Sequence, residues 1–252
     1  MQFIHGDCLD KMQEIPDGSI DMVMADPPYG TTACKWDSII PLEPMWKQLK
    51  RVIKSNGAIV MTASQPFTSI LIMSNIEMFK YCWVWMKTRM CNFPMIKGSP
   101  GKIHEDIAVF SFGTIPRHNG TPMVYNPQEL KVINKKTTYK YGGDCKFMPN
   151  RKLKFKDGIQ AYTNYPKSIL QISNEDNTAH PTQKPVALME YLIKTYTNEG
   201  ETVLDFAMGS GTTGVACFNL NRNFIGIEKI ERYVKLAKRR IIMEKYLSER
   251  TE

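Results

Sequence analysis

A carboxylate, two prolines and an aromatic ring stand side by side at Asp26-Pro27-Pro28-Tyr29. The prolines fix the local backbone and remove two N–H donors, which leaves carbonyl groups to accept hydrogen bonds. This set suits a flat heterocycle with an exocyclic amino group: Tyr29 would stack on the ring, while Asp26 and the Pro27 carbonyl would accept the two amino hydrogens. Holding both hydrogens out of the ring plane would localise the lone pair on the nitrogen and make it a nucleophile. The alternative is a proline-rich turn with a capping aspartate.

A glycine-rich turn gives the second chemical signal, because it follows a predicted strand and opens a predicted helix. Gly209, Gly211 and Gly214 have the G-x-G-x-x-G spacing of dinucleotide sites, in which glycines let the backbone pass close to a ligand. Glu228 ends the next predicted strand, where a carboxylate suits the two hydroxyl groups of a ribose. The turn therefore predicts a site for a cofactor that contains adenosine.

The order of the predicted strands brings the two motifs together. Only 24 residues follow Glu228, enough for one helix, so we expect the strands that complete the sheet to come from the N-terminal half. In an open parallel sheet, ligands bind beyond the carboxyl ends of the strands, near the point where the strand order reverses. Asp26, which follows the predicted strand of residues 20–25, is therefore expected to share a rim with the glycine-rich turn.

Helix and strand signals alternate along most of the chain, which predicts an α/β protein. The apolar patterns and end signals predict strands over residues 20–25, 58–61, 79–87, 106–112, 202–205 and 224–228. They predict helices over residues 43–54, 67–77, 186–196, 212–220 and 231–247. Between residues 113 and 168 the pattern is lost among Gly, Pro, Asn, Lys and aromatic residues, as in an inserted module or a long functional loop.

The positive charge of the chain is concentrated in that irregular stretch. Residues 131–170 contain ten basic and two acidic residues, an excess equal to the net charge of +8 of the whole chain. Six aromatic residues are interleaved with the charges. Lysines that neutralise phosphates beside rings that stack on bases are typical of nucleic-acid binding. The alternative is a solvated loop rich in lysine.

Three motifs in this order resemble the DNA amino-methyltransferases that use S-adenosylmethionine. Residues 26–29 are similar to their [D/N/S]-P-P-[Y/F/W] motif, and residues 180–185 (His-Pro-Thr-Gln-Lys-Pro) to another sequence typical of the family. Residues 206–211 are similar to the F-x-G-x-G loop, although the first glycine of that loop is absent near Ala207 and Met208. The order of catalytic motif, variable region and cofactor loop is similar to the β group of these enzymes.

The resemblance implies an α/β fold: a single Rossmann-like methyltransferase domain with a mostly parallel, circularly permuted sheet and an inserted target-recognition region. Residues 1–112 would form the catalytic half of the domain, residues 113–170 the target-recognition insertion, and residues 171–252 the cofactor-binding half. The cofactor would be S-adenosylmethionine, and the partner double-stranded DNA. A homodimer and a cognate restriction endonuclease are possible further partners.

The resemblance also implies roles for individual residues. The flipped target base would be held by Asp26, Pro27, Pro28 and Tyr29. The cofactor would be bound by Asp7, Thr182, Lys184, Asp205, Phe206, Gly209, Ser210, Gly211, Thr212 and Glu228. Thr182 and Lys184 are candidates for its carboxylate, with a helix-entry turn as the alternative. DNA-binding residues would be Lys135, Lys136, Lys140, Arg151, Lys152, Lys154 and Lys156. Trp83, Trp85 and Lys87 occupy positions near the target base in the family, whereas the bare sequence places the two tryptophans in the core.

The implied reaction is site-specific methylation of N6 of adenine. Asp at the first motif position favours adenine in this family and Ser favours cytosine, so N4 of cytosine is the alternative. Methylation of a cytosine ring carbon needs a nucleophilic cysteine, typically after a proline, and no Pro-Cys pair exists here. A nicotinamide-dependent dehydrogenase would leave residues 26–29 and the basic stretch unexplained, and a non-catalytic DNA-binding subunit would be expected to lose Asp26 or Tyr29.

Composition sets the remaining expectations. Apolar residues make up 42% of the chain, as in a globular protein with a core. No apolar run approaches the length of a membrane span, and the N-terminus has no secretory signal, so we expect a cytoplasmic protein with no membrane association. The six cysteines are scattered and expected to be free thiols, and four histidines without paired cysteines predict no metal site.

Overall fold

The computed structural model describes residues 1–31, 37–91, 94, 96–115, 120–141, 154–175, 183–248 and 250. The chain divides into two compact units, one of residues 1–126 with 168–252 and one of residues 127–167. The smaller unit lies within the stretch predicted as an insertion. Each unit is described by itself below.

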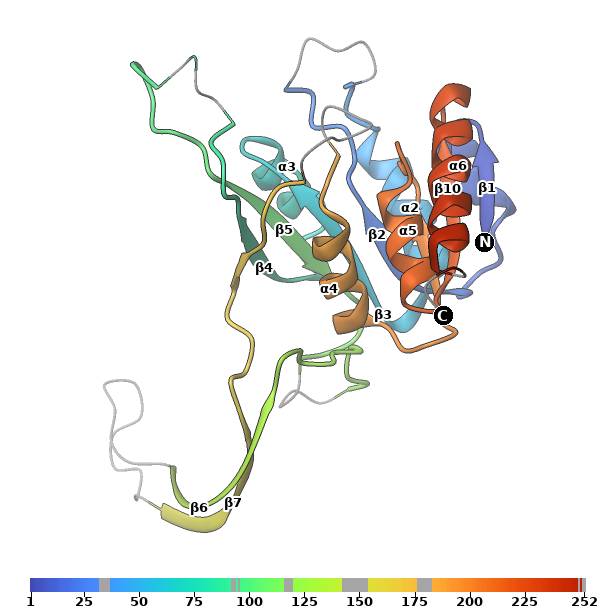
Figure 1. Ribbon diagram of the computed structural model, residues 1–252. Helices are drawn as coiled ribbons and strands as arrows, with labels where there is room; N and C mark the ends of the chain where they lie inside the picture. Colours follow the sequence, from blue (N-terminus) through green and yellow to red (C-terminus); the bar gives the residue numbers. More distant parts are fainter. Residues whose placement is uncertain are drawn as a thin grey trace. The chain divides into compact units, whose positions relative to one another are not determined.

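An eight-stranded sheet runs through the larger unit (Figure 1). Its strand order is β1 (Gln2–His5), β10 (Asn223–Glu228), β9 (Thr202–Asp205), β2 (Ile20–Ala25), β3 (Ile53–Ala63), β5 (His104–Phe110), β4 (Phe79–Met86) and β8 (Ile169–Gln171). All neighbouring strands are parallel except that β5 is antiparallel to β3 and β4. Strands β9 and β10, late in the sequence, lie between β1 and β2, and this order confirms the mostly parallel, permuted sheet.

Helices cover both faces of this sheet and enclose two apolar cores. Alternation along β2 separates them, because successive side chains of a strand point to opposite faces. Met22 and Met24 pack in the cluster that includes residues of α4 (Val186–Tyr196), α5 (Thr212–Asn219) and α6 (Glu231–Ser248). Val23 and Ala25 pack in the cluster of α1 (Cys8–Lys11), α2 (Leu42–Val52) and α3 (Phe67–Met73), with the short 3-10 turn η1 (Met12–Glu14). A strand buried on both faces is held firmly, and β2 is the strand that ends at Asp26.

Most predicted elements of the larger unit are present, and one difference has a clear cause. The helix predicted to residue 54 ends at Val52, and Ile53 begins β3. The Asn56-Gly57 pair is typical of the end of a helix, but Gly57 lies inside β3, where a Cβ atom would be 2.6 Å from the carbonyl oxygen of Asp21. The pairing of β2 with β3 shifts register beside this position. Gly57 therefore allows a close strand approach at an irregularity rather than ending a helix.

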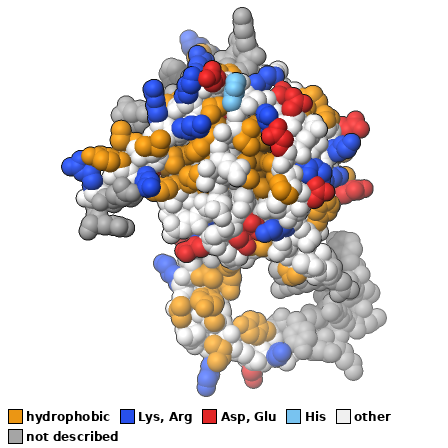
Figure 2. Space-filling model, turned by 90° about the vertical axis from the view of Figure 1, so that its right-hand side faces the viewer, with side chains coloured by type: hydrophobic (Ala, Val, Ile, Leu, Met, Phe, Trp, Pro, Cys, Tyr) orange, Lys and Arg blue, Asp and Glu red, His pale blue; other side chains and the backbone are white. Residues whose placement is uncertain are grey.

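The smaller unit contains a regular strand pair that the sequence did not predict. β6 (Lys131–Tyr141) and β7 (Lys154–Thr163) form a two-stranded antiparallel sheet. Its apolar side chains Val132, Phe155 and Ile159 are more than half exposed, and Figure 2 shows apolar and basic side chains together on it. None of the described side chains of β6 and β7 belongs to either apolar core cluster. The alternation of apolar and polar residues that identifies a half-buried strand is therefore missing.

No helix in the described part of the chain is long and apolar enough to cross a membrane.

Candidate active site

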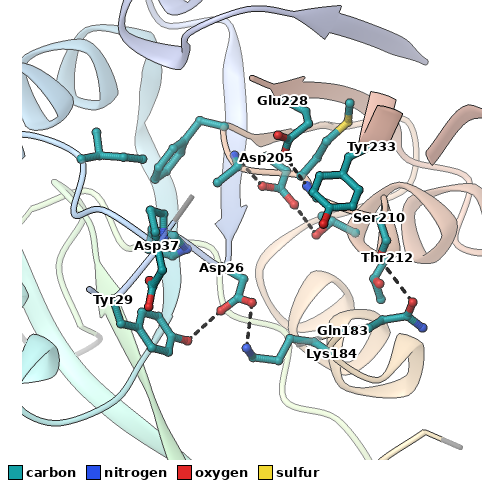
Figure 3. A pocket seen from close by; sticks show the side chains of 18 of the residues that line it. Asp26, Tyr29, Asp37, Gln183, Lys184, Asp205, Ser210, Thr212, Glu228 and Tyr233 are labelled. Atoms are coloured by element: carbon teal, nitrogen blue, oxygen red, sulfur yellow. Dashed lines mark hydrogen bonds and ion pairs between the residues drawn. The ribbon is translucent and has the colours of Figure 1, made fainter. Parts of the chain in front are cut away.

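One cavity of about 1000 Å³ is lined by both strand-end motifs (Figure 3). Asp26 and Tyr29 line it beyond the end of β2, and Asp205, Gly209 and Glu228 line it at the ends of β9 and β10. The pairing of β2 with β9 places these ends side by side, although almost 180 residues separate them. The shared rim that the strand order predicts is therefore present.

The glycine-rich turn is held against Glu228 by backbone hydrogen bonds. The Gly209 N–H donates to Oε2 of Glu228 at 3.0 Å, and the Ile230 N–H donates to Oε1 at 2.8 Å. Gly209 has φ of 50°, and no atom lies within 4 Å of the position that its Cβ would take. Gly211 has φ of 80°, and its Cβ would lie 2.6 Å from the Cβ of Ala237 in α6. The first glycine thus leaves room beside the turn, and the second allows close packing of α5 on α6.

Two more acidic residues stand at this end of the cavity, in different environments. Asp205 is buried and accepts hydrogen bonds from the Ala207 N–H at 3.0 Å and the Thr213 hydroxyl at 2.6 Å. Burial raises the pKa of Asp205 to about 7. Asp7 accepts from the Leu9 N–H and from Lys229, both at 3.0 Å, and these bonds lower its pKa. Asp205 therefore shapes the turn from inside, while Asp7 lies at the mouth beside the end of β10.

Phe206, Ser210 and Thr212, three more of the predicted cofactor residues, are also placed at this turn. Phe206 is almost fully buried and lines the cavity. Arg240 of α6 donates to the Ser210 carbonyl at 2.9 Å, the Ser210 hydroxyl at 3.0 Å and the Thr212 hydroxyl at 3.1 Å. Sequence reasoning missed Arg240, because nothing in its local sequence connects it to a turn 30 residues earlier. Thr182 lies outside the described residues.

Asp26 is surrounded by donors from several elements. Its Oδ1 accepts from the Tyr29 hydroxyl at 2.7 Å, and its Oδ2 accepts from Lys184 Nζ at 2.7 Å (Figure 3). The Thr62 hydroxyl of β3 also donates to Oδ1. The Tyr29 ring stacks on Phe67, with ring centroids 5.4 Å apart and planes 21° apart. Burial and the neighbouring Asp26 carboxylate raise the pKa of Tyr29 well above its usual value. The Tyr29 hydroxyl therefore keeps its proton and donates to Asp26.

Lys184 lies at the base end of the cavity. Its ammonium contacts Asp26 and lies 3.3 Å from Oε2 of Glu105. Burial by itself would lower the pKa of Lys184, but the carboxylates of Asp26 and Glu105 raise it above its usual value. The side chain is thus a buried cation between two acidic groups. Its assignment to the cofactor carboxylate stays a prediction, and the contacts seen here are with the chain itself.

Two further polar residues of the site had no local sequence signal. Asp37 accepts the Gly30 and Thr31 N–H groups at 2.9 Å each, which fixes the loop that follows Tyr29. Glu105 on β5 pairs with both Lys184 and Lys87, and Lys87 Nζ lies 5.0 Å from the centroid of the Trp85 ring. The contacts of Glu105 join residues that are distant in the sequence, so only the folded chain reveals them.

The two tryptophans of β4 belong to the core, as the bare sequence indicates. Trp83 donates to the Tyr196 hydroxyl at 2.6 Å and Trp85 to the Ile172 carbonyl at 2.8 Å, and both are nearly fully buried. Trp85 also lines the cavity together with Lys87.

The cavity suits an adenosine-containing cofactor by size and by donor set. Its volume matches that of sites for drug-sized ligands. The carboxylates of Glu228 and Asp7 can accept hydrogen bonds from ribose hydroxyls and an adenine amino group, and Gly209 leaves space for the ligand. Among the described residues, no group of His, Cys, Asp and Glu side chains could hold a metal ion.

Comparisons with known proteins agree with this site. The profile of a family of N6/N4 methyltransferases, described as DNA methylase, matches residues 20–239. The chain is 26% identical to the Type II methyltransferase M.HpaI of Haemophilus parainfluenzae, over 96% of this chain and 74% of that one. It is 28% identical to the DNA adenine methyltransferase YhdJ of Escherichia coli, over 97% of this chain and 84% of that one. The solved structure of the M1.HpyAVI–SAM complex has a TM-score of 0.64 and 25% identity, covering 95% of this chain and 98% of that one. The chain therefore belongs to this DNA methylase family, whose members methylate N6 of adenine or N4 of cytosine and use S-adenosylmethionine.

Proposed function

We propose that this protein is a site-specific DNA methyltransferase that methylates N6 of an adenine flipped out of the double helix. The observation that carries this proposal is the joint lining of one cavity by Asp26 and Tyr29 at one end and by Gly209 and Glu228 at the other. An acceptor and a stacking ring thus face a cofactor turn. Because the reacting base must reach Tyr29, it has to leave the helical stack.

The chain's contribution to the reaction is mainly positioning. S-adenosylmethionine supplies a methyl group bound to a positively charged sulfur. Asp26 and the Pro27 carbonyl would accept the two amino hydrogens, and Tyr29 would hold the ring, so that the nitrogen lone pair points at the methyl carbon. Asp7, Glu228 and the turn at Gly209 would hold this donor, which would give its methyl group to the nitrogen and keep the electron pair of the broken C–S bond on sulfur. The methylated nitrogen then releases its extra proton to Asp26, which need not be a strong base because that proton is acidic.

Adenine is the proposed target because Asp stands at the first motif position, and the E. coli relative is named a DNA adenine methyltransferase. Cytosine N4 is the second candidate, since it also offers an amino group beside a ring nitrogen. Asp26 and the Pro27 carbonyl can accept hydrogens from either base.

Residues 113–170, which contain the compact unit of residues 127–167, are proposed as the target-recognition region. Lys135, Lys136 and Lys156 are exposed on the strand pair of this unit, where ammonium groups can neutralise phosphates. Lys140 and Lys154 lie on the same strands, but the structure does not describe their side chains. Arg151 and Lys152 lie outside the described residues. Their DNA-binding role is proposed from sequence. A cytoplasmic location, a homodimer and a cognate restriction endonuclease are also proposals that rest on the sequence.

The base can be identified from the product. The purified protein is incubated with radiolabelled S-adenosylmethionine and plasmid DNA, the DNA is digested to nucleosides, and the labelled nucleoside is separated by chromatography. We expect N6-methyldeoxyadenosine. Labelled N4-methyldeoxycytidine would establish the second candidate, and the absence of label with protein that binds the cofactor would contradict the proposed function. Sequencing of modified bases in the same plasmid would give the recognition site.

A further inference from the structure

The Lys184 ammonium occupies contacts that the proposed reaction assigns to the target base. Its Nζ lies 2.7 Å from Oδ2 of Asp26 and 5.6 Å from the centroid of the Tyr29 ring. Asp26 is the group that would accept an amino hydrogen, and Tyr29 is the ring on which the base would stack. The free protein therefore holds a cation at the contacts that bind the base.

Asp26 has little acceptor capacity left in this state. An ionised carboxylate offers about four lone-pair sites. The hydroxyl groups of Tyr29 and Thr62 and the ammonium of Lys184 already occupy three of them. One site remains for an amino hydrogen, and a base that takes it shares the carboxylate with the Lys184 cation unless that cation withdraws. Of the three donors, Lys184 has a second carboxylate, Glu105, within reach.

Glu105 provides the receiving group. Its Oε2 is buried and accepts no hydrogen bond from the described residues, although Lys184 Nζ lies 3.3 Å away. A buried carboxylate oxygen without a hydrogen-bond partner is costly, so a nearby ammonium has a favourable place to move to. The other oxygen of Glu105 is held by Lys87, which keeps the carboxylate in place while Lys184 shifts.

Electrostatics favours the same shift. During methyl transfer, positive charge develops on the amino nitrogen that Asp26 holds, and an ammonium at the same carboxylate would oppose it. We infer that Lys184 is a positioning residue that holds Asp26 and Tyr29 in the free protein and moves to Glu105 when the target base docks. This inference rests on the proposed function, but it applies equally to adenine and to cytosine.

The first test needs neither DNA nor activity. The titratable groups that face Lys184 are Asp26, Glu105 and Tyr29, with Lys87 behind Glu105. The pKa of Lys184 is measured by 13C NMR on protein labelled at lysine, with K184M to assign the signal. In D26N we expect this pKa to fall, because the Asp26 carboxylate that helps to raise it is removed. The matched control is D21N, which removes the carboxylate of the Lys54–Asp21 pair at the amino ends of β2 and β3. It should leave the pKa of Lys184 unchanged.

The second test separates movement from a merely structural role, because two variants should have opposite effects. A duplex carries the fluorescent base 2-aminopurine at the methylated position, so that its emission reports base extrusion. K184M removes the competitor, and we expect extrusion at least equal to that of the wild type. E105Q keeps the size of the side chain but removes the receiving charge, so that Lys184 stays at Asp26. We expect extrusion and kcat to fall by about tenfold, the effect of about 1.4 kcal/mol, with cofactor affinity within about twofold of wild type.

Three results would overturn the inference. One is an unchanged pKa of Lys184 in D26N. Another is equal loss of base extrusion in K184M and E105Q, which would indicate a structural role for both. The third is a cofactor affinity reduced by about tenfold or more in K184M, which would return Lys184 to the cofactor carboxylate. If no DNA is methylated at all, the NMR titration still shows whether Lys184 contacts Asp26. Failure of the proposed function can therefore be told apart from failure of this inference.

Discussion

The two ends of the cavity satisfy their carboxylates in different ways. At the cofactor end, Glu228 and Asp205 accept backbone N–H groups from the adjoining turns, at Gly209, Ile230 and Ala207. At the base end, Asp26 accepts hydrogen bonds only from side chains among the described residues, and these side chains come from separate elements. Backbone donors are fixed by the turn itself, whereas side-chain donors can rotate away. The cofactor end is therefore fixed by the backbone, and we call it the preformed end. The base end can exchange the hydrogen-bond partners of Asp26, and we call it the exchangeable end.

The largest effect is expected at the exchangeable end. Asp26→Ala removes the acceptor for the amino group and leaves Lys184 with Glu105 alone. We expect methyl transfer to fall by about a thousandfold or more, since a group that positions the reacting atoms is lost. Cofactor affinity should stay within about threefold of wild type, because Asp26 lies apart from the glycine-rich turn. Rates come from radiolabel transfer and affinities from calorimetry.

Asp17→Ala is the matched control for that variant. Asp17 is an exposed aspartate that pairs with Arg51. It precedes the amino end of β2, whereas the cavity lies beyond the carboxyl end of that strand. Its removal should leave both the rate and the affinity unchanged. Full activity in Asp26→Ala would contradict the assignment of residues 26–29.

At the preformed end, substitution of Gly211 should mainly lower stability, and substitution of Gly209 should mainly weaken cofactor binding. Gly211→Ala places a Cβ 2.6 Å from Ala237 at a φ of 80°, so we expect a loss of about 2–4 kcal/mol in the free energy of unfolding. Gly209→Ala meets no atom within 4 Å, so its cost should be the backbone strain of about 1–2 kcal/mol. Its methyl group enters the ligand space and should weaken cofactor binding more than its small stability cost suggests. Denaturant unfolding and calorimetry on both variants measure this contrast, and equal stability losses would contradict it.

The sequence predicted the preformed end better than the exchangeable one. The bounds of α4, β2 and β9 match the predicted ranges, because continuous or periodic apolar residues set them. The turn at Gly209 and the acceptor at Glu228 follow from one strand–turn–helix unit. Lys184 could not be placed this way, since its neighbour Glu105 lies on the one antiparallel strand of the sheet, 79 residues earlier. Contacts between distant elements depend on the strand order, which local patterns do not contain.

A smaller effect is expected at Asp37, which supports the exchangeable end through backbone donors. Asp37→Asn keeps one acceptor oxygen but loses the second, so either the Gly30 or the Thr31 N–H loses its partner. We expect kcat to fall by about tenfold, which corresponds to about 1–2 kcal/mol for a lost hydrogen bond to a charged group. Cofactor affinity should not change. A fall in affinity with constant kcat would show that the loop after Tyr29 serves the cofactor instead of the base.

The smallest effect is a pH dependence of stability, and it compares two carboxylates of the preformed end. Burial raises the pKa of Asp205 to about 7, so the folded protein binds this proton more tightly than the unfolded chain. Its favourable contribution is complete below about pH 4, the unfolded pKa, and is lost as the pH rises through 7. Asp205→Asn should therefore make the unfolding midpoint less dependent on pH between about 5 and 8.

Asp7→Asn is the opposite case, because hydrogen bonds with Lys229 and the Leu9 N–H lower the pKa of Asp7 in the folded protein. Its contribution is present above the unfolded pKa and is lost as the pH falls below about 4. Urea unfolding of both variants from below about pH 4 to about pH 8 checks whether the two carboxylates change stability with pH in opposite directions. If Asp205→Asn kept the full dependence of the wild type between about pH 5 and 8, the buried aspartate would not be the group that titrates there, and the turn would owe its form to its backbone bonds alone.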